Sequence, residues 1–251
     1  MDEQALFVEQ KRRVEQARLA LEQDANGDLS YRHVMSILAM YGPPLENGVI
    51  NAKWGQKLGV APAENQASLR GWQRRSWNAL LCAEKVLPLW SFDTIKPHLN
   101  QHGVDALGRL NLGNHIVDAK VAVLLEEEFS VPDFRPGGES LVCELADQSK
   151  ASVLVYQASG AYWSIEQILI LIRIDKEPPF ATDRIYPEKW EDDDDVDWGQ
   201  YPPAIYTSCA IAGESNSANS PLNDIHARRQ FWLWWLNEVV PASWNLQELN
   251  D

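Results

Sequence analysis

Apolar residues return at helical spacing along most of this chain, and proline or glycine separates each such stretch from the next. The first stretch has this spacing in Leu6, Phe7, Val14, Ala17 and Leu21, with charged residues between them. Residues three or four apart share one face of a helix. The chain is therefore predicted to be mostly α, with Asn26-Gly27 ending the first helix.

Further helices are predicted from the same spacing and from residues that begin or end helices. One is expected through Tyr31, Val34, Ile37 and Leu38, capped by Asp28 or Ser30 and ending at Gly42-Pro43-Pro44. The others are expected at 68–87, ended by Pro88; at 92–101; at 115–129, ended before Pro132; at 204–212; and at 223–240, capped by Asn223 or Asp224 and ended by Pro241. Residues 42–65 are rich in Gly, Pro and Asn and are expected to form a loop.

Periodicity does not separate helix from strand in the segment 152–174. Val153-Leu154-Val155-Tyr156 suits a strand, and Ile168 to Ile172 is apolar on every side. Ser159-Gly160 is expected to interrupt the segment, after which Ser164 and Gln167 form a capping box that favours a helix. We predict helix here and leave open minor strand content near 152–174.

The predicted organisation is a single helical domain with one long acidic loop. Residues 177–203 combine several prolines with a run of acidic residues, which is typical of irregular chain. No linker divides two cores. Residues 1–62 are predicted to be an N-terminal helical extension, and residues 63–251 an all-α domain, with one continuous core.

The chain is strongly acidic, which limits its partners. Its 22 basic and 36 acidic residues give a formal net charge of −14. Such a surface repels nucleic-acid phosphates and anionic lipid headgroups and attracts basic proteins. Three cysteines without a Cys-x-x-Cys pair argue against a disulfide framework. With no basic, apolar leader at its start, the chain is expected to be cytoplasmic, with no nucleic-acid or membrane partner.

The sequence contains no motif that predicts a catalytic residue, a metal or a cofactor. The glycine motifs of nucleotide-binding proteins and the Gly-x-Ser-x-Gly elbow are absent. His98 and His102 lie four apart, but only Asp93 and Asp105 are near them in sequence as a third ligand. The stretch Asp24 to Asp28 starts like a calcium loop, but its glycine and its twelfth residue do not fit, so we interpret it as a turn between helices.

Eleven tryptophans are a high number for this length. Trp232 and Trp235 lie three apart on one helical face and are expected in the core. For Trp190 and Trp198, which flank the acidic run, core and interface stay equally open. Aromatic anchors beside dense negative charge are typical of a recognition surface. The predicted partner-binding residues are Trp190, Glu191, Asp192, Asp193, Asp194, Asp195, Asp197 and Trp198.

Two pairs of arginines stand out in this acidic chain. They are Arg74-Arg75 on the predicted helix 68–87 and Arg228-Arg229 near the start of the last helix. We predict that both pairs form intramolecular salt bridges instead of binding a ligand.

Two stretches carry recognisable motifs. The helix from Trp77 to Leu89 contains Cys82-Ala83-Glu84-Lys85-Val86-Leu87, and the last helix contains Arg228-Arg229-Gln230-Phe231-Trp232 followed by Trp235. Together with Ile205 to Gly213, they resemble the fifth family of immunity proteins of bacterial polymorphic-toxin systems. The motif residues are mainly packing residues: Trp77, Cys82, Ala83, Glu84, Val86, Leu87, Arg228, Arg229, Phe231, Trp232 and Trp235.

The resemblance implies an all-α cytoplasmic protein, not an enzyme, that binds and neutralises a cognate toxin. The negative charge suits a basic toxin, such as a nuclease or another effector that acts in the cytoplasm. Occlusion would follow from fast electrostatic capture and slow release at aromatic anchors. Two alternatives stay open: an adaptor or chaperone for a secreted effector, and an immunity enzyme that reverses the toxin's modification.

Overall fold

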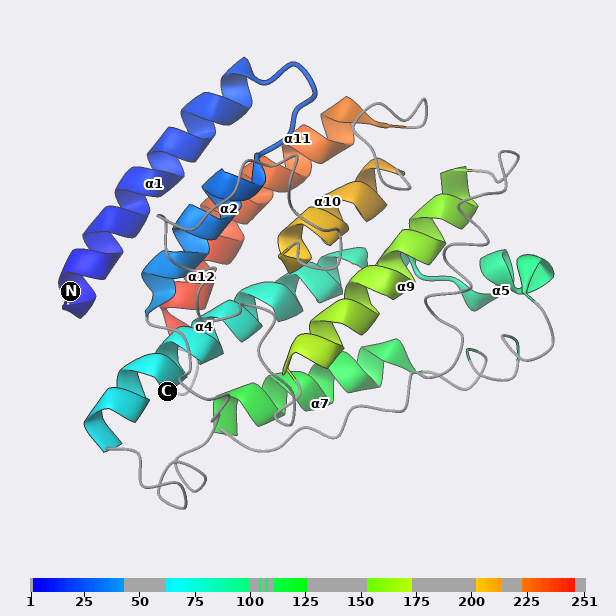
Figure 1. The fold of residues 1–251 in the computed structure, drawn as a ribbon. Coiled ribbons are helices and arrows are strands. Elements are labelled where there is room, and N and C mark those ends of the chain that lie inside the picture. Colours follow the sequence, from blue (N-terminus) through cyan, green and yellow to red (C-terminus); the bar gives the residue numbers. More distant parts are fainter. Residues whose placement is uncertain are drawn as a thin grey trace.

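The computed structural model describes residues 2–42, 62–99, 104, 107, 111–125, 153–172, 202–213 and 223–246. Every regular element in these ranges is a helix, as predicted (Figure 1). The elements are α1 (Glu3–Gln23), α2 (Tyr31–Leu38), η1 (Ala39–Tyr41), α4 (Pro62–Val86), η3 (Leu87–Leu89), α5 (Phe92–Ile95), η4 (Lys96–His98), α7 (Leu112–Leu125), α9 (Val153–Ile172), α10 (Pro203–Ala212), α11 (Ile225–Trp234), the π-helical turn η8 (Trp235–Val239) and α12 (Val240–Trp244).

Short polar side chains begin several of these helices. Asp2 accepts a hydrogen bond from the backbone N–H of Ala5 at 2.7 Å, and Asp224 accepts one from Ala227 at 2.9 Å. Ser30, not Asp28, caps α2 by accepting from the N–H of His33. These caps satisfy donors that the first turn of a helix leaves free. The structure thus decides between the alternative caps that the sequence offers.

Helix α4 lies in the middle of the molecule (Figure 1). It packs against α7, α9, α10, α12 and η1. Leu80, Cys82, Ala83 and Val86 of α4 have no exposed surface. Side chains of α1 and α2 belong to the same buried cluster as those of α4, α9 and the C-terminal helix.

The segment Val153–Ile172 is one continuous helix, so the minor strand considered near 152–174 is wrong for these residues. Ser159-Gly160 does not interrupt it. A Cβ on Gly160 would lie 3.0 Å from the Ala210 Cβ, which shows that Gly160 lets α9 and α10 approach closely. Ser164 is not a cap either: it lies inside α9, and its hydroxyl is 2.9 Å from that of Thr207 on α10. Gly160 and Ser164, which the sequence analysis interprets as helix breaker and helix cap, instead lie where α9 packs against α10.

The sequence predicts that the last helix ends at Pro241, and this is wrong. The C-terminal helix, made of α11, η8 and α12, continues to Trp244 through the π-helical turn Trp235–Val239. The N–H of Val240 bonds to the carbonyl of Trp235, five residues earlier. In an α-helix, a proline ring collides with the carbonyl four residues before it and has no N–H to donate. One wider turn before Pro241 relieves both problems, so the helix passes the proline.

Other predicted boundaries shift by a few residues. The helix predicted from Ser68 starts at Pro62, and the helix predicted at 115–129 spans Leu112–Leu125. The helix predicted at 92–101 is a single α turn followed by the 3-10 turn η4. The predicted loop 177–203 lies outside the described residues, apart from its last two positions. No helix among the described residues is long and apolar enough to cross a membrane.

Candidate partner-binding surface

The aromatic residues of the second sequence motif lie on the buried face of the C-terminal helix. Phe231, Trp232 and Trp235 are each no more than 1% exposed. The Phe231 and Trp232 rings lie 5.0 Å apart, and the Trp232 and Trp235 rings meet edge to face at 5.6 Å. These three aromatic residues therefore anchor the helix by packing.

Asp28 joins the turn after α1 to the C-terminal helix. Its carboxylate accepts a hydrogen bond from Trp232 Nε1 at 2.6 Å and one from Arg228 Nη1 at 2.7 Å. Arg228 is only 1% exposed, and Arg229 donates to the carbonyl oxygen of Asp24. The stretch from Asp24 to Asp28 is thus a turn held by the arginine pair.

The other arginine pair also serves the fold. Arg74 forms an ion pair with Glu3 and lies 3.9 Å from the ring of Trp244. Arg75 donates to the carbonyl oxygen of Gly42 at 2.9 Å. The predicted salt bridges therefore form at Arg74 and Arg228, while Arg75 and Arg229 also bind backbone carbonyls.

A chain of buried hydrogen bonds connects α4 to the C-terminal helix. Trp235 Nε1 donates to Asn78 Oδ1 at 2.9 Å, Asn78 Nδ2 donates to the Tyr41 hydroxyl at 3.0 Å, and that hydroxyl donates to the Val240 carbonyl at 3.2 Å. Burial raises the pKa of Tyr41 far above its ordinary value of 10, so the hydroxyl keeps its proton. A satisfied network of this kind fixes one arrangement of the helices.

Most side chains of the first motif lie on the inner face of α4. Trp77, Cys82, Ala83 and Val86 are buried and Leu87 is partly buried, whereas Glu84 is exposed and forms an ion pair with Lys120 of α7; these are packing positions and a surface tie. Burial raises the pKa of the Cys82 thiol well above its usual range and that of Cys209 to about 11. Both thiols therefore keep their protons at neutral pH.

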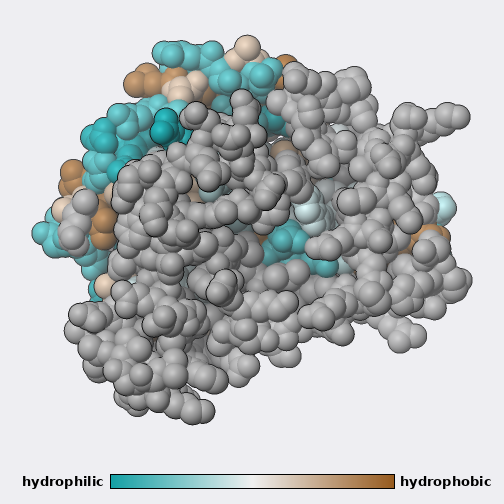
Figure 2. Space-filling model, viewed as in Figure 1, coloured by the Kyte–Doolittle hydropathy of each residue, from teal (hydrophilic) through white to brown (hydrophobic). Residues whose placement is uncertain are grey.

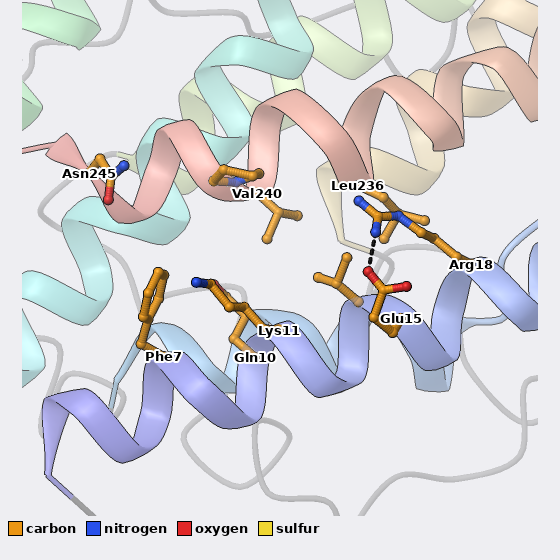
Figure 3. A pocket seen from close by; sticks show the side chains of 10 residues that line it. Phe7, Gln10, Lys11, Glu15, Arg18, Leu236, Val240 and Asn245 are labelled. Atoms are coloured by element: carbon orange, nitrogen blue, oxygen red, sulfur yellow. Dashed lines mark hydrogen bonds and ion pairs between the residues drawn. The ribbon is translucent and has the colours of Figure 1, made fainter.

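Helix α1 and the C-terminal helix flank a groove of about 470 Å³ (Figure 3). Contacts between its two walls lie near Phe7 and near Arg18. At one end the rings of Phe7 and Trp244 stack with their centroids 5.1 Å apart, and at the other Arg18 donates a hydrogen bond to Asn237. The walls are formed by Phe7, Gln10, Lys11, Val14, Glu15 and Arg18 of α1 and by Leu236, Val240, Pro241 and Asn245 opposite them.

Apolar side chains form most of the groove, and three charged side chains stand on the α1 wall. Lys11 extends along α1 toward Phe7, and its Nζ lies 4.1 Å from the centroid of the Phe7 ring (Figure 3). Glu15 pairs with Arg18. Gln10 is 2% exposed, and among the described residues its amide nitrogen Nε2 has no hydrogen-bond partner.

Outside the groove, α1 is mostly hydrophilic. In the part of Figure 2 that belongs to described residues, hydrophilic side chains predominate along α1 and hydrophobic ones are scattered between them. Val8 and Leu19 of α1 are each 58% exposed. Isolated apolar residues of this kind are ordinary on a surface.

The predicted partner-binding residues lie outside the described part of the chain. They are Trp190, Glu191, Asp192, Asp193, Asp194, Asp195, Asp197 and Trp198. Within the described ranges, no three His, Cys, Asp or Glu side chains are grouped as metal ligands, and His102 lies beyond those ranges.

The groove itself was not predicted from the sequence. Its one signal is Gln10, a polar residue on the face of α1 that otherwise buries Val14, Ala17 and Leu21. A helix buries such a residue at a cost unless the residue is paired. The groove forms because α1 packs beside the C-terminal helix, which is far away in the sequence. The apolar spacing of either helix alone does not predict that contact.

Comparison with known proteins identifies one family. Residues 180–242 match the family model described as Immunity protein Imm5, and no curated protein matches the chain. The matched segment includes α10, α11, η8 and the start of α12, as well as the predicted acidic surface. The match contains the second motif and not the first, and it confirms the resemblance to this family over that part of the chain: residues 180–242 are similar to Imm5, an immunity protein family of polymorphic toxin systems.

Proposed function

We propose that this chain is an immunity protein that binds a cognate toxin and neutralises it. The match of residues 180–242 to Imm5 is the observation that carries the proposal. That segment supplies both the tightly packed C-terminal helix and one wall of the groove beside α1. Toxin immunity accounts for the family match, and a toxin is the partner it implies.

The mechanism proposed is occlusion of the toxin, without chemistry on any substrate. Several polar side chains of the core have structural roles. Asp28 binds Trp232 and Arg228, and burial raises the pKa of both described thiols. These engagements support a protein that acts by binding.

Charge supports a basic toxin as partner. The formal net charge of −14 attracts a positively charged protein from a distance and speeds its capture. We propose that the acidic residues from Glu191 to Asp197 make the first contact and that Trp190 and Trp198 act as anchors. The cytoplasm, where such a toxin would act, is the proposed location.

Co-expression with the product of the neighbouring gene tests this function. Cells that produce that protein alone should stop growing, and cells that also produce this chain should grow and yield a complex of the two on affinity purification. A growth defect that the chain does not relieve would contradict immunity. A chaperone would bind the same protein but leave its purified activity intact, so an activity measurement on the complex separates the two functions.

A further inference from the structure

Helix α7 carries apolar residues on two faces, and only one of these faces is buried. Ile116 and Ala119 lie in the core and are at most 1% exposed. Val117, Val121 and Leu125 are instead 57%, 48% and 59% exposed. A helix that is apolar on all sides is ordinarily buried on all sides. The outward face of α7 therefore has the composition of a face that a partner covers.

The three exposed residues lie in one line along α7. They are four residues apart, so they share a face of the helix over about 12 Å of its axis and together form the α7 stripe. Scattered apolar residues are ordinary on a surface, whereas a contiguous group is typical of a contact surface. The other large apolar residues exposed in the described ranges are scattered over three helices: Val8, Leu19, Leu154 and Ile225.

The charges beside the α7 stripe are negative. Asp118 is exposed, lies three residues before Val121 on the same side of the helix, and has no ion-pair partner among the described residues. Lys120, the lysine of α7, is neutralised by its ion pair with Glu84. The three residues that follow Leu125 in the sequence are glutamates. A partner that covers the stripe must therefore bring positive charge to its edge.

The form of the surface indicates a helical segment as the partner. The backbone hydrogen bonds of α7 are made within the helix, so α7 offers no strand edge with which an extended peptide could pair. A helix with apolar residues at the same spacing can pack them between Val117, Val121 and Leu125. A second copy of this chain is disfavoured, because it has the same net charge of −14 and the same Asp118.

We propose that the α7 stripe binds an amphipathic helix of the toxin whose apolar face is bordered by lysine or arginine. The apolar residues of that helix pack against Val117, Val121 and Leu125, and one of its basic side chains pairs with Asp118. Residues 180–242, which match Imm5, do not include α7, so the family match does not assign this surface. The inference rests on the proposed function and adds a contact surface to the acidic segment 191–197.

Two glutamine variants test the α7 stripe against the toxin encoded by the neighbouring gene, with affinity measured by calorimetry on the purified full chains. Val121→Gln and Leu125→Gln each remove apolar contact and should lower the affinity about tenfold. Their Tm should not fall, because both side chains are exposed and glutamine is a good helix former.

Leu19→Gln is the matched control for Leu125→Gln. Leu19 is 58% exposed, against 59% for Leu125, and its helix α1 lies at the opposite edge of the molecule from α7 (Figure 1). The affinity of this control should stay within about twofold of the wild type.

A charge reversal tests the edge of the α7 stripe. Asp118→Lys should lower the affinity about tenfold at low salt and by less at high salt, because salt screens exposed charges. Glu22→Lys, at an exposed position of α1, changes the net charge equally and should have a smaller effect. Equal affinities of the two lysine variants at low salt would contradict a basic border on the partner helix.

The outcomes separate this inference from the proposed function. If the wild type binds the toxin and both glutamine variants bind equally well, the α7 stripe is not a contact surface, although immunity stands. If those variants lower Tm together with affinity, the stripe packs within the chain itself and the inference fails. A wild type that sediments as a dimer, and that Val121→Gln turns into a monomer, would show a second copy as the occupant and also overturns the proposal. If the wild type itself does not bind the toxin, the proposed function fails first, and the inference with it.

Discussion

Asp28 connects two parts of the chain that are two hundred residues apart. Its carboxylate binds Trp232 Nε1 and Arg228 Nη1, and Arg228 is almost fully buried. A buried guanidinium costs several kcal/mol to desolvate, and its carboxylate partner offsets that cost. Arg228 and Trp232 lie in the segment that matches the immunity family. Their partner Asp28 lies in the turn after α1, which the family match does not cover.

Replacing Asp28 should expose this dependence. Asp28→Ala leaves the charge of Arg228 without its carboxylate, and we expect the free energy of unfolding to fall by about 3–5 kcal/mol. Urea denaturation measures it, with Asp118→Ala on the exposed face of α7 as a control that should change stability by less than about 0.5 kcal/mol. Equal stability of the two variants would show that Arg228 does not depend on Asp28.

At the scale of helices, the sequence predicts where most elements lie but not how they cross. Apolar spacing and caps suffice for α1, α2 and α10, because those signals are local. Ser159-Gly160 and Pro241 mislead, since a glycine also permits close helix packing and a π-helical turn also accommodates a proline. Which of the two roles a residue has depends on a neighbouring helix, and that information is not in the local pattern.

The crossing of α9 and α10 can be tested with one methyl group. Gly160→Ala places a Cβ 3.0 Å from the Ala210 Cβ and 3.1 Å from its Cα. Overpacking should outweigh the gain in helix propensity and lower the free energy of unfolding by about 1–2 kcal/mol. Thermal unfolding measures this loss of stability. The double variant Gly160→Ala, Ala210→Gly should recover much of the lost free energy of unfolding. A single variant more stable than the wild type would show that the helices separate readily.

The start of α1 should loosen in acid. Glu3 bonds to Arg74 and Arg70 of α4, and the hydrogen bond from Arg74 is the main cause that holds the pKa of Glu3 below 4.5. A carboxylate whose pKa is lower in the folded state contributes stability above its unfolded pKa, and this is lost as pH falls through the folded value. The protection factors of the α1 amides, which are exchange rates corrected for the intrinsic effect of pH, should therefore fall below about pH 4.5, and Glu3→Gln should show the lower protection already at neutral pH. Equal exchange in both proteins at all pH values would contradict the anchoring role.

For the whole molecule, composition predicts the class of partner and the structure adds a candidate surface. The apolar spacing suffices for a helical fold, and the two motifs suffice for the resemblance to an immunity family that residues 180–242 also match. The groove could not be predicted, because Gln10 and Lys11 on α1 meet Val240 only after more than two hundred residues of chain have folded. Local signals such as caps predict elements, whereas binding surfaces arise from packing.

Long-range attraction is expected to depend on the acidic run. Replacing Asp192, Asp193, Asp194 and Asp195 with Asn removes four negative charges, so association with a basic toxin should slow and vary less with salt, while dissociation changes little. Stopped-flow measurements at low and high ionic strength give both rates. An unchanged association rate at low salt would mean that these residues do not steer the toxin.

Titration of the purified toxin's activity with this chain tests occlusion most directly. We expect inhibition to increase linearly with added chain, to be complete at a fixed molar ratio and to be immediate, because each toxin molecule must be covered. Inhibition by far less than that ratio, growing with incubation time, would show an enzyme that acts on the toxin or its product. An activity that no amount of the chain reduces would contradict immunity altogether.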